Sequence, residues 1–201
     1  LELQSAIALQ CFTNEYIYSH PAEDTWSLNE LECDVHNSLK NGNQPSALSV
    51  ACLASYKALY NYSWHDLLYL TDDLTELVTR QIAEPQQENL LRTEMPVLTE
   101  IIDGVSLNVR EQYEEYPYPR WINLQIPMLA KPIHRMAHEI NLKIIHKKIF
   151  ESVEPKILIA GCGTGQHSIQ TAIRFKDCNV LAIDLSLSSL AYAKRKTQEL
   201  G

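Results

Sequence analysis

The sequence predicts an α/β protein, in which an all-helical N-terminal half precedes a strand–helix–strand–helix unit. No strand pattern occurs before residue 100, where apolar residues recur at helical spacing instead. Two short apolar runs follow later, at 157–160 and 179–183, and each ends in turn or polar residues, which is typical of buried parallel strands. We therefore expect a helical domain over 1–104, a linker and lead-in helix over 105–152, and a second domain over 153–201.

The N-terminal half divides into helices at its prolines, glycines and caps. A first helix over 1–19 should end before Pro21, because the residue before a proline avoids the helical region. A second should begin at the capping box Ser27–Glu30, with Trp26 packed on Leu31, and stop in a left-handed turn at Gly42. Further helices are expected at 46–59, from Ser63, at 72–83 and at 86–92.

The middle of the chain should be less regular. Residues 95–108 have the composition of a connector, and prolines alternating with aromatic residues over 112–121 predict an extended segment. Its tyrosines, tryptophan and arginine are suited either to form a wall over a planar ligand or to pack the linker against the domain. A helix over 141–152 should then lead into the first strand.

Three of the six glycines lie in five consecutive positions directly after the first strand, at Gly161, Gly163 and Gly165. Glycine is required where the backbone turns tightly at positive φ and a ligand approaches closely. The helix expected from Gln166 then offers free backbone N–H groups to that ligand. Asp184 ends the second strand, 19 residues after Gly165, where a carboxylate can accept hydrogen bonds from two ribose hydroxyls. The pattern predicts a nucleoside site.

The run from Ile157 to Gly165, followed by Val180–Asp184, resembles the first two motifs of class I S-adenosylmethionine-dependent methyltransferases. The segment 109–121 is similar to one found in bacterial methyltransferases fused to tetratricopeptide repeats, although no such repeat is visible in this chain. The resemblance implies a Rossmann-like methyltransferase fold with S-adenosyl-L-methionine as cofactor and a methyl acceptor that the sequence does not identify. Such folds have seven strands, so we expect this chain to hold only the first part and to have little activity alone.

The resemblance also assigns roles to residues. The loop and first helical turn would line the methionine end of the cofactor, Asp184 would take the ribose and Leu185 would pack on the adenine. Tyr113 and Arg120 are the contacts expected from the segment across the cleft mouth. The loop residues concerned are Gly161, Cys162, Gly163, Thr164, Gly165, Gln166 and His167. Cys162 is interpreted as a small residue in a tight turn rather than a nucleophile, and no catalytic base is identified.

Two other functions compete with this prediction. A dinucleotide-dependent oxidoreductase would read G-x-G-x-x-G, but Gln166 stands where the third glycine belongs. A non-catalytic interaction module would keep the fold and lose the ligand. The helical half is expected to serve as a lid, a recognition domain, a homodimer surface or a packing cap.

The composition narrows the range of possible binding partners. The net charge of −8 argues against nucleic acid or an anionic membrane, and the cluster Lys194, Arg195 and Lys196 is expected to be a solvated helix face. Five scattered cysteines suit a reducing cytoplasm. His134 and His138 lie one helical turn apart, but Arg135 replaces the glutamate of a zincin motif, so no metal site is expected.

Overall fold

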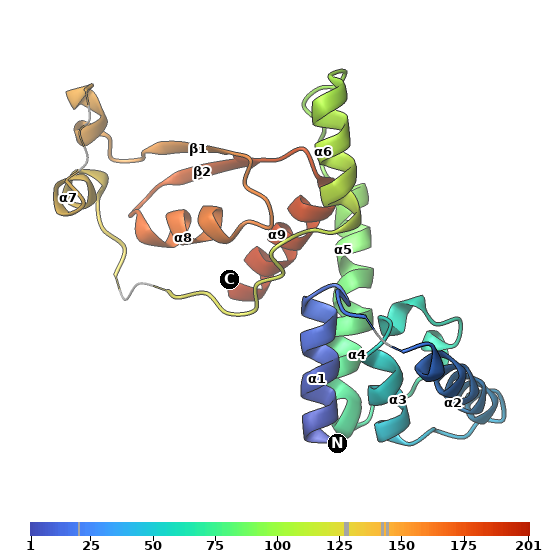
Figure 1. Ribbon diagram of the computed structural model, residues 1–201. Helices are drawn as coiled ribbons and strands as arrows, with labels where there is room; N and C mark the ends of the chain where they lie inside the picture. Colours follow the sequence, from blue (N-terminus) through green and yellow to red (C-terminus); the bar gives the residue numbers. More distant parts are fainter. Residues whose placement is uncertain (20, 127–128, 142, 144) are drawn as a thin grey trace. The chain divides into compact units, whose positions relative to one another are not determined.

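The computed structural model describes residues 1–19, 21–126, 129–141, 143 and 145–201. The chain forms two compact units, Leu1–Gln87 and Glu88–Gly201, whose internal arrangement is drawn in Figure 1. The division falls ahead of residue 104, where the sequence suggests a boundary. Within the described ranges, no helix combines the length and the apolar character needed to cross a membrane.

In its described part, the first unit consists of helices joined by turns, as the sequence predicts. Its helical elements are α1 (Glu2–Thr13), α2 (Ala22–Lys40), α3 (Ala47–Ala54), the 3-10 helices η1 (Leu59–Asn61), η2 (His65–Leu67) and η3 (Asp72–Leu74), α4 (Thr75–Val78) and the π-helical turn η4 (Thr79–Ala83). The helix α5 (Glu84–Thr93) contains the division between the units.

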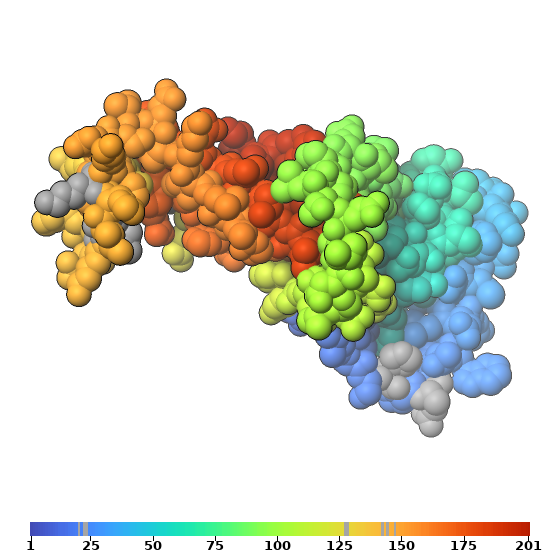
Figure 2. Space-filling view, turned by 90° about the horizontal axis from the view of Figure 1, so that it is seen from above, coloured from blue at the N-terminus to red at the C-terminus, as the bar shows by residue number. Residues whose placement is uncertain are grey.

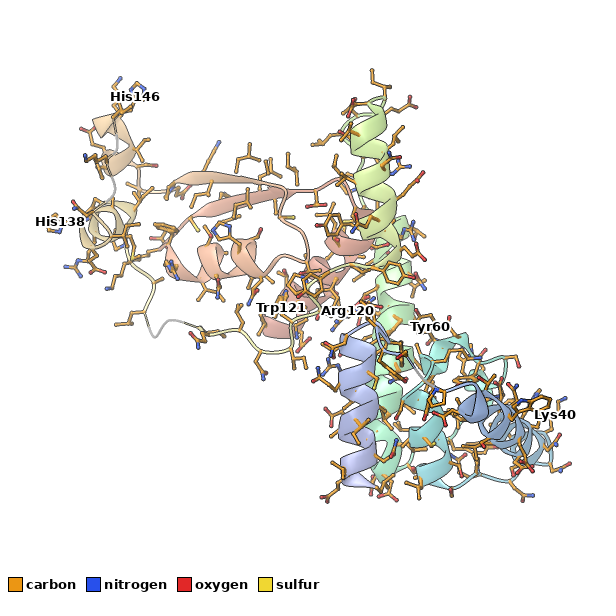
Figure 3. All side chains as sticks on the ribbon, in the orientation of Figure 1. Lys40, Tyr60, Arg120, Trp121, His138 and His146 are labelled. Atoms are coloured by element: carbon orange, nitrogen blue, oxygen red, sulfur yellow. The ribbon has the colours of Figure 1, made fainter. Side chains whose placement is uncertain are left out.

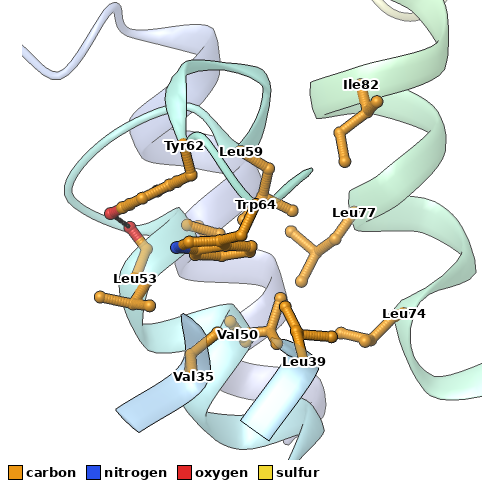
Figure 4. Close-up of a cluster of buried hydrophobic side chains, with 13 residues drawn as sticks. Val35, Leu39, Val50, Leu53, Leu59, Tyr62, Trp64, Leu74, Leu77 and Ile82 are labelled. Atoms are coloured by element: carbon orange, nitrogen blue, oxygen red, sulfur yellow. Dashed lines mark hydrogen bonds between the residues drawn. The ribbon is translucent and has the colours of Figure 1, made fainter. Parts of the chain in front are cut away.

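An aromatic pair and one buried amide organise the core of the first unit. The Trp64 ring is fully buried and stacks on Tyr62, with 4.7 Å between ring centroids (Figure 4). Gln81, also fully buried, accepts a hydrogen bond from the Leu59 N–H at 3.0 Å. Its side-chain nitrogen donates to the carbonyl oxygens of Ala8 and Ala54, each at 3.2 Å. Gln81 thereby provides hydrogen-bond partners for buried backbone groups of three different segments.

Several of the predicted helix boundaries in this unit are wrong, and the third helix, predicted over 46–59, ends at Ala54. Helix α1 ends at Thr13, well before Pro21, because Glu15 and Tyr16 adopt left-handed φ values of 53° and 55°. Helix α2 already begins at Ala22, with Pro21 in the N-cap position. The Ser27 capping box is therefore not used.

The Trp26 side chain is 81% exposed, so it does not form the predicted staple against Leu31. The predicted stop after the second helix is confirmed, since Gly42 has a φ of +73°. The predicted break near residue 84 does not occur, because helical structure runs from Asp72 to Thr93. Pro85 is the second residue after the π-helical turn, so its missing N–H falls where the hydrogen-bond register already changes.

The second unit contains the predicted strand–helix–strand–helix order. Strand β1 (Lys156–Ala160) leads to α8 (Gln166–Arg174), and β2 (Asn179–Ile183) leads to α9 (Leu187–Leu200). The two strands are parallel, in a register that runs from Lys156 opposite Asn179 to Ala160 opposite Ile183. Ahead of them lie α6 (Gly104–Glu115), α7 (Ile133–Glu139) and the 3-10 helix η5 (Lys147–Glu151).

The small sheet has one covered and one open face. Helix α8 lies along one face (Figure 1), against which Ile159 is buried. Leu158 and Leu181, opposite each other in the register, point to the other face and are each 61% exposed. Among the described residues, the two strands thus leave an apolar face open.

The region before the sheet differs from the prediction. Helix α6 begins at Gly104 because Asp103 caps it, accepting the Ser106 N–H at 2.9 Å, and it continues through Tyr113. The chain is therefore helical where an extended segment was predicted, and leaves the helix only at Tyr116. The predicted helix over 141–152 is also wrong, because Asn141 has a φ of 53° and η5 is a short 3-10 helix. Residues 142 and 144 lie outside the described residues.

Candidate functional site

The glycine loop closes over the end of β2. The N–H groups of Gly161 and Cys162 both donate to the carbonyl oxygen of Ile183, at 2.8 and 3.0 Å. Gly161, Gly163 and Gly165 have φ values of 73°, 53° and 82°, in the left-handed region where side chains other than glycine are strained. The loop therefore connects the carboxyl ends of both strands, as its sequence predicts.

The three glycines have different surroundings. A Cβ atom added at Gly165 would lie 2.5 Å from the Cβ of Ala193, so this glycine allows α8 to begin close to α9. A Cβ added at Gly161 or Gly163 would meet nothing within 4 Å. These two positions thus leave room above the loop that a bound molecule can use.

Asp184 links the loop to the start of α9. One carboxylate oxygen accepts the Gly163 N–H at 2.7 Å, and the other accepts the Ser186 N–H at 3.0 Å. A carboxylate has about four acceptor positions, so two remain for a ligand. The side chain is half-buried, which keeps those positions accessible. Asp184 can therefore orient the loop and accept ligand hydroxyls at the same time.

The start of α8 offers donors to the same region. The N–H groups of Thr164, Gln166 and His167 have no hydrogen-bond partner among the residues that the structure describes. Unpaired N–H groups and the helix dipole together make such an N-terminus favourable for an anionic group. The donors lie beside Gly163 and Gly165, next to the open space above the loop.

Cys162 is buried within the loop. Burial, with a smaller contribution from the nearby Asp184 charge, raises the pKa of its thiol to about 11. The side chain therefore stays a neutral thiol at physiological pH, whereas a nucleophilic cysteine needs a lowered pKa. This agrees with its interpretation as a small residue in a tight turn.

The segment 116–122, which we call the strap, is attached to the glycine loop. Thr164 donates its hydroxyl to the Pro119 carbonyl at 2.8 Å, and the Trp121 indole N–H donates to the Thr164 carbonyl at 3.0 Å. Trp121 is buried with Ile169 and Tyr192. Of the two roles that the sequence allowed for these aromatic residues, Trp121 thus has the packing role.

Arg120 points into a buried charge cluster rather than into open solvent. Its guanidinium lies 3.4 Å from Glu88 and over the Tyr192 ring, and Figure 3 shows it next to Trp121. Glu88 also pairs with Arg195 at 2.8 Å. The assignment of Arg120 to cofactor contact remains a prediction, and any such contact would compete with Glu88.

Two residues of the Lys194–Lys196 cluster do not lie on the solvated face that its composition suggests. The side chains of Arg195 and Lys196 are each only 5% exposed. Lys196 donates to the carbonyl of Ile122 in the strap at 3.1 Å and pairs with Glu199 at 2.7 Å. The correction has a physical cause: Glu88, distant in sequence, neutralises Arg195, and the nearby Glu199 neutralises Lys196, so both charges can be buried.

Tyr113 reaches the site through its backbone. Its carbonyl accepts the Ser186 hydroxyl at 3.0 Å, and its side chain is exposed. Leu185, predicted to pack on adenine, is also exposed and directly follows Asp184. Glu114, which binds the first turn of α9, was not among the residues predicted from the sequence. Only its place beside Tyr113 could have drawn attention to it, since its partner Ser188 lies 74 positions later.

Among the described residues, no three His, Cys, Asp or Glu side chains gather as metal ligands would. His138 lies at the far end of the unit from Arg120 and Trp121 (Figure 3).

A comparison with known families gives a match that covers the glycine loop. Residues 157–201 match the family model described as a methyltransferase domain, over a range that includes β1 except Lys156, the loop, Asp184 and α9. No curated protein gave a significant match to the chain, and neither did any solved structure. The match confirms, over residues 157–201, the resemblance to a methyltransferase domain that was drawn from the loop and Asp184.

Proposed function

We propose that the protein is an S-adenosylmethionine-dependent methyltransferase whose cofactor is held by the 161–165 loop and by Asp184. The observation that carries the proposal is the position of the Asp184 carboxylate. It is bonded to the Gly163 N–H at 2.7 Å, beside two glycines with open space above them. The proposal extends the methyltransferase-domain match from a family to a ligand.

The described residues fit this cofactor. The two remaining acceptor positions of Asp184 suit the two ribose hydroxyls. Leu185 offers an exposed apolar surface for adenine. The unpaired N–H groups of Thr164, Gln166 and His167 suit the carboxylate of the methionine part. Tyr113 remains a proposed contact through its exposed ring.

Adenosylmethionine supplies a methyl group that its sulfonium already activates. The part of the protein described here would bind and orient, because in-line displacement requires the acceptor to be aligned behind that methyl. The free amides at the start of α8 and the Asp184 carboxylate would fix the two ends of the molecule. The methyl acceptor and a base are left open.

The fold and the compartment belong to the same proposal. The parallel pair β1–β2 with its connecting helix α8 supports a Rossmann-like arrangement. The cysteines support work in a reducing cytoplasm, because all five are free thiols: Cys11, Cys33, Cys52, Cys162 and Cys178.

Calorimetric titration of the chain with adenosylmethionine and, separately, with NAD tests the proposal. We expect binding of adenosylmethionine only. Asp184→Ala should weaken that binding by roughly tenfold or more, because hydrogen bonds to a charged group are lost. Asp184→Asn, which keeps one acceptor oxygen, should be intermediate. Glu154→Ala is the matched control, since Glu154 is an exposed carboxylate of the same unit just before β1.

Other results would favour the competing functions. Binding of NAD would support the oxidoreductase, despite Gln166 in the place of the third glycine. If the folded chain and both of its folded Asp184 variants bind neither adenosylmethionine nor NAD, the result would support a non-catalytic module.

A further inference from the structure

Two consecutive residues of α6 hold the first turn of α9. The Tyr113 carbonyl accepts the Ser186 hydroxyl at 3.0 Å. The Glu114 carboxylate accepts the Leu187 N–H with one oxygen and the Ser188 hydroxyl with the other, the latter at 2.8 Å. Three consecutive residues after β2 are thus attached to a helix that precedes the sheet by about 40 positions. Figure 2 shows α6 (green) beside the red surface of the C-terminal part of the unit.

This attachment continues to the loop through hydrogen bonds. The Ser186 N–H donates to one oxygen of Asp184, and the other oxygen of Asp184 accepts the Gly163 N–H. The fully buried Ser186 also caps α9, because its hydroxyl accepts the Ser189 N–H at 3.0 Å. A shift of the first turn of α9 would therefore move the carboxylate that orients Gly163.

Glu114 also has a partner outside α9. Arg92, at the end of α5, pairs with the same Glu114 oxygen that accepts the Ser188 hydroxyl, at 2.8 Å. The Glu114 side chain is only 16% exposed, so its three partners hold it in place with little competition from water. Its neighbour Glu115 is exposed and has no partner among the described residues.

We propose that Glu114 is a positioning residue for the cofactor site: by holding residues 187 and 188 it fixes Ser186, and through Ser186 the orientation of Asp184 toward Gly163. The consequence for cofactor affinity rests on the proposed function. The consequence for the loop does not rest on the proposed function. The series of hydrogen bonds that connects Glu114 to Gly163 through Ser186 and Asp184 is formed without a ligand.

Amide hydrogen exchange resolved to single residues tests the proposal on the 201-residue chain. In Glu114→Ala we expect exchange of the Gly163 and Ser186 amides to become about tenfold faster, because hydrogen bonds to a charged group are lost. Glu114→Gln keeps an acceptor for Leu187 and should restore much of the protection. Glu115→Ala is the matched control on the same helix and should leave the Gly163 amide unchanged.

The pattern of exchange separates positioning from simple capping. If only the Leu187 amide exchanges faster in Glu114→Ala while Gly163 stays protected, Glu114 is merely a cap of α9 and the proposal is wrong. If Glu114→Ala does not fold, Ser188→Ala removes one of the two contacts and allows the same comparison.

Titration with adenosylmethionine adds an independent readout. Glu114→Ala should weaken binding about tenfold, and Glu115→Ala should not change it. If the unmodified chain fails to bind adenosylmethionine, the proposed function fails, but the exchange of Gly163 still decides the role of Glu114.

Discussion

Gly165 combines two constraints at one residue. Its φ of +82° strains any other side chain, and a Cβ would approach the Ala193 Cβ to 2.5 Å. Gly161 shares the first constraint, with a φ of +73°, but has open space around it. The two glycines therefore allow backbone strain to be separated from steric overlap.

We predict that Gly165→Ala destabilises the second unit more than Gly161→Ala does. Both variants should lose about 1–2 kcal/mol to the left-handed backbone. Gly165→Ala should lose about 1–3 kcal/mol more by overlap with Ala193. Urea unfolding followed by circular dichroism measures both. Ala193→Gly in the Gly165→Ala background should recover part of the loss, and equal stabilities of the two single variants would contradict the prediction.

The glycines and Asp184 could be predicted from sequence because their signal is local. Three glycines after an apolar run specify a turn at positive φ, and a strand of fixed length brings Asp184 to the same edge. Glu114 has no comparable signal, because its role depends on a hydrogen bond with Ser188 in another element. Long-range hydrogen bonds of this kind leave no periodicity in either segment.

At the scale of elements, helix α9 has buried charged side chains on one of its faces. Arg195 packs over the Tyr192 ring, with 4.8 Å from guanidinium to ring centroid, and pairs with Glu88 of α5. Glu88 also pairs with Arg120 of the strap. One carboxylate thus joins α5, the strap and α9 within the second unit.

We predict that Glu88→Ala strongly destabilises α9 and the strap. Removing the carboxylate leaves two largely buried guanidinium groups short of a partner, and breaking a buried pair costs about 3–5 kcal/mol. Because Arg195 also pairs with Glu199, we expect the lower end of that range. Native-state hydrogen exchange of α9 amides measures the loss.

Glu94→Ala provides the matched control. Glu94 follows α5 and pairs with Lys194 of α9 at 3.5 Å, but both side chains are well exposed. Such pairs contribute about 0–1 kcal/mol, so this variant should be close to the unmodified chain. Similar losses of stability in Glu88→Ala and Glu94→Ala would show that the buried ion pairs stabilise the unit no more than the exposed pair does.

The elements show which sequence signals were sufficient. Strands β1 and β2 and helices α8 and α9 appear in the predicted order, because apolar runs and glycines mark their ends. Helix α6 was missed because the prolines after it suggested an extended chain, although Pro117 and Pro119 lie beyond its last residue, Glu115. The burial of Arg195 was missed because its partner Glu88 is 107 positions away.

At the scale of the whole molecule, the two units rely on different polar contacts. The second unit buries ion pairs around Glu88, whereas the first uses the phenol groups of three tyrosines, of which Tyr62 is buried, Tyr16 half-buried and Tyr18 exposed. Three tyrosine hydroxyls donate to three consecutive carbonyls at the end of α3: Tyr62 to Leu53 and Tyr16 to Ala54, each at 3.1 Å, and Tyr18 to Ser55. These hydroxyls add to the hydrogen bonds at the helix end, where the Leu53 carbonyl also accepts backbone N–H groups and the Ala54 carbonyl also accepts from Gln81.

These phenols make the first unit sensitive to alkali. Burial is the largest cause that raises their pKa values: that of Tyr18 goes from 10.0 to about 12, and those of Tyr16 and Tyr62 rise further. Above pH 10 the unfolded chain loses phenolic protons that the folded unit retains. Since the folded state then binds more protons, stability is complete below pH 10 and falls as pH rises through 12.

We therefore predict that the helices of the first unit unfold in the alkaline range above pH 10, together with a cooperative rise in tyrosinate absorbance. Ionisation removes the proton that each phenol donates to α3, so deprotonation and loss of structure should coincide. Circular dichroism and absorbance, followed on the same samples, measure both. Tyr62→Phe keeps the ring stacked on Trp64 but has no proton to lose, so it should lessen the dependence of stability on pH. Tyrosines that titrate near pH 10 while the helical signal stays unchanged would show that the three phenols are accessible and that the end of α3 does not depend on them.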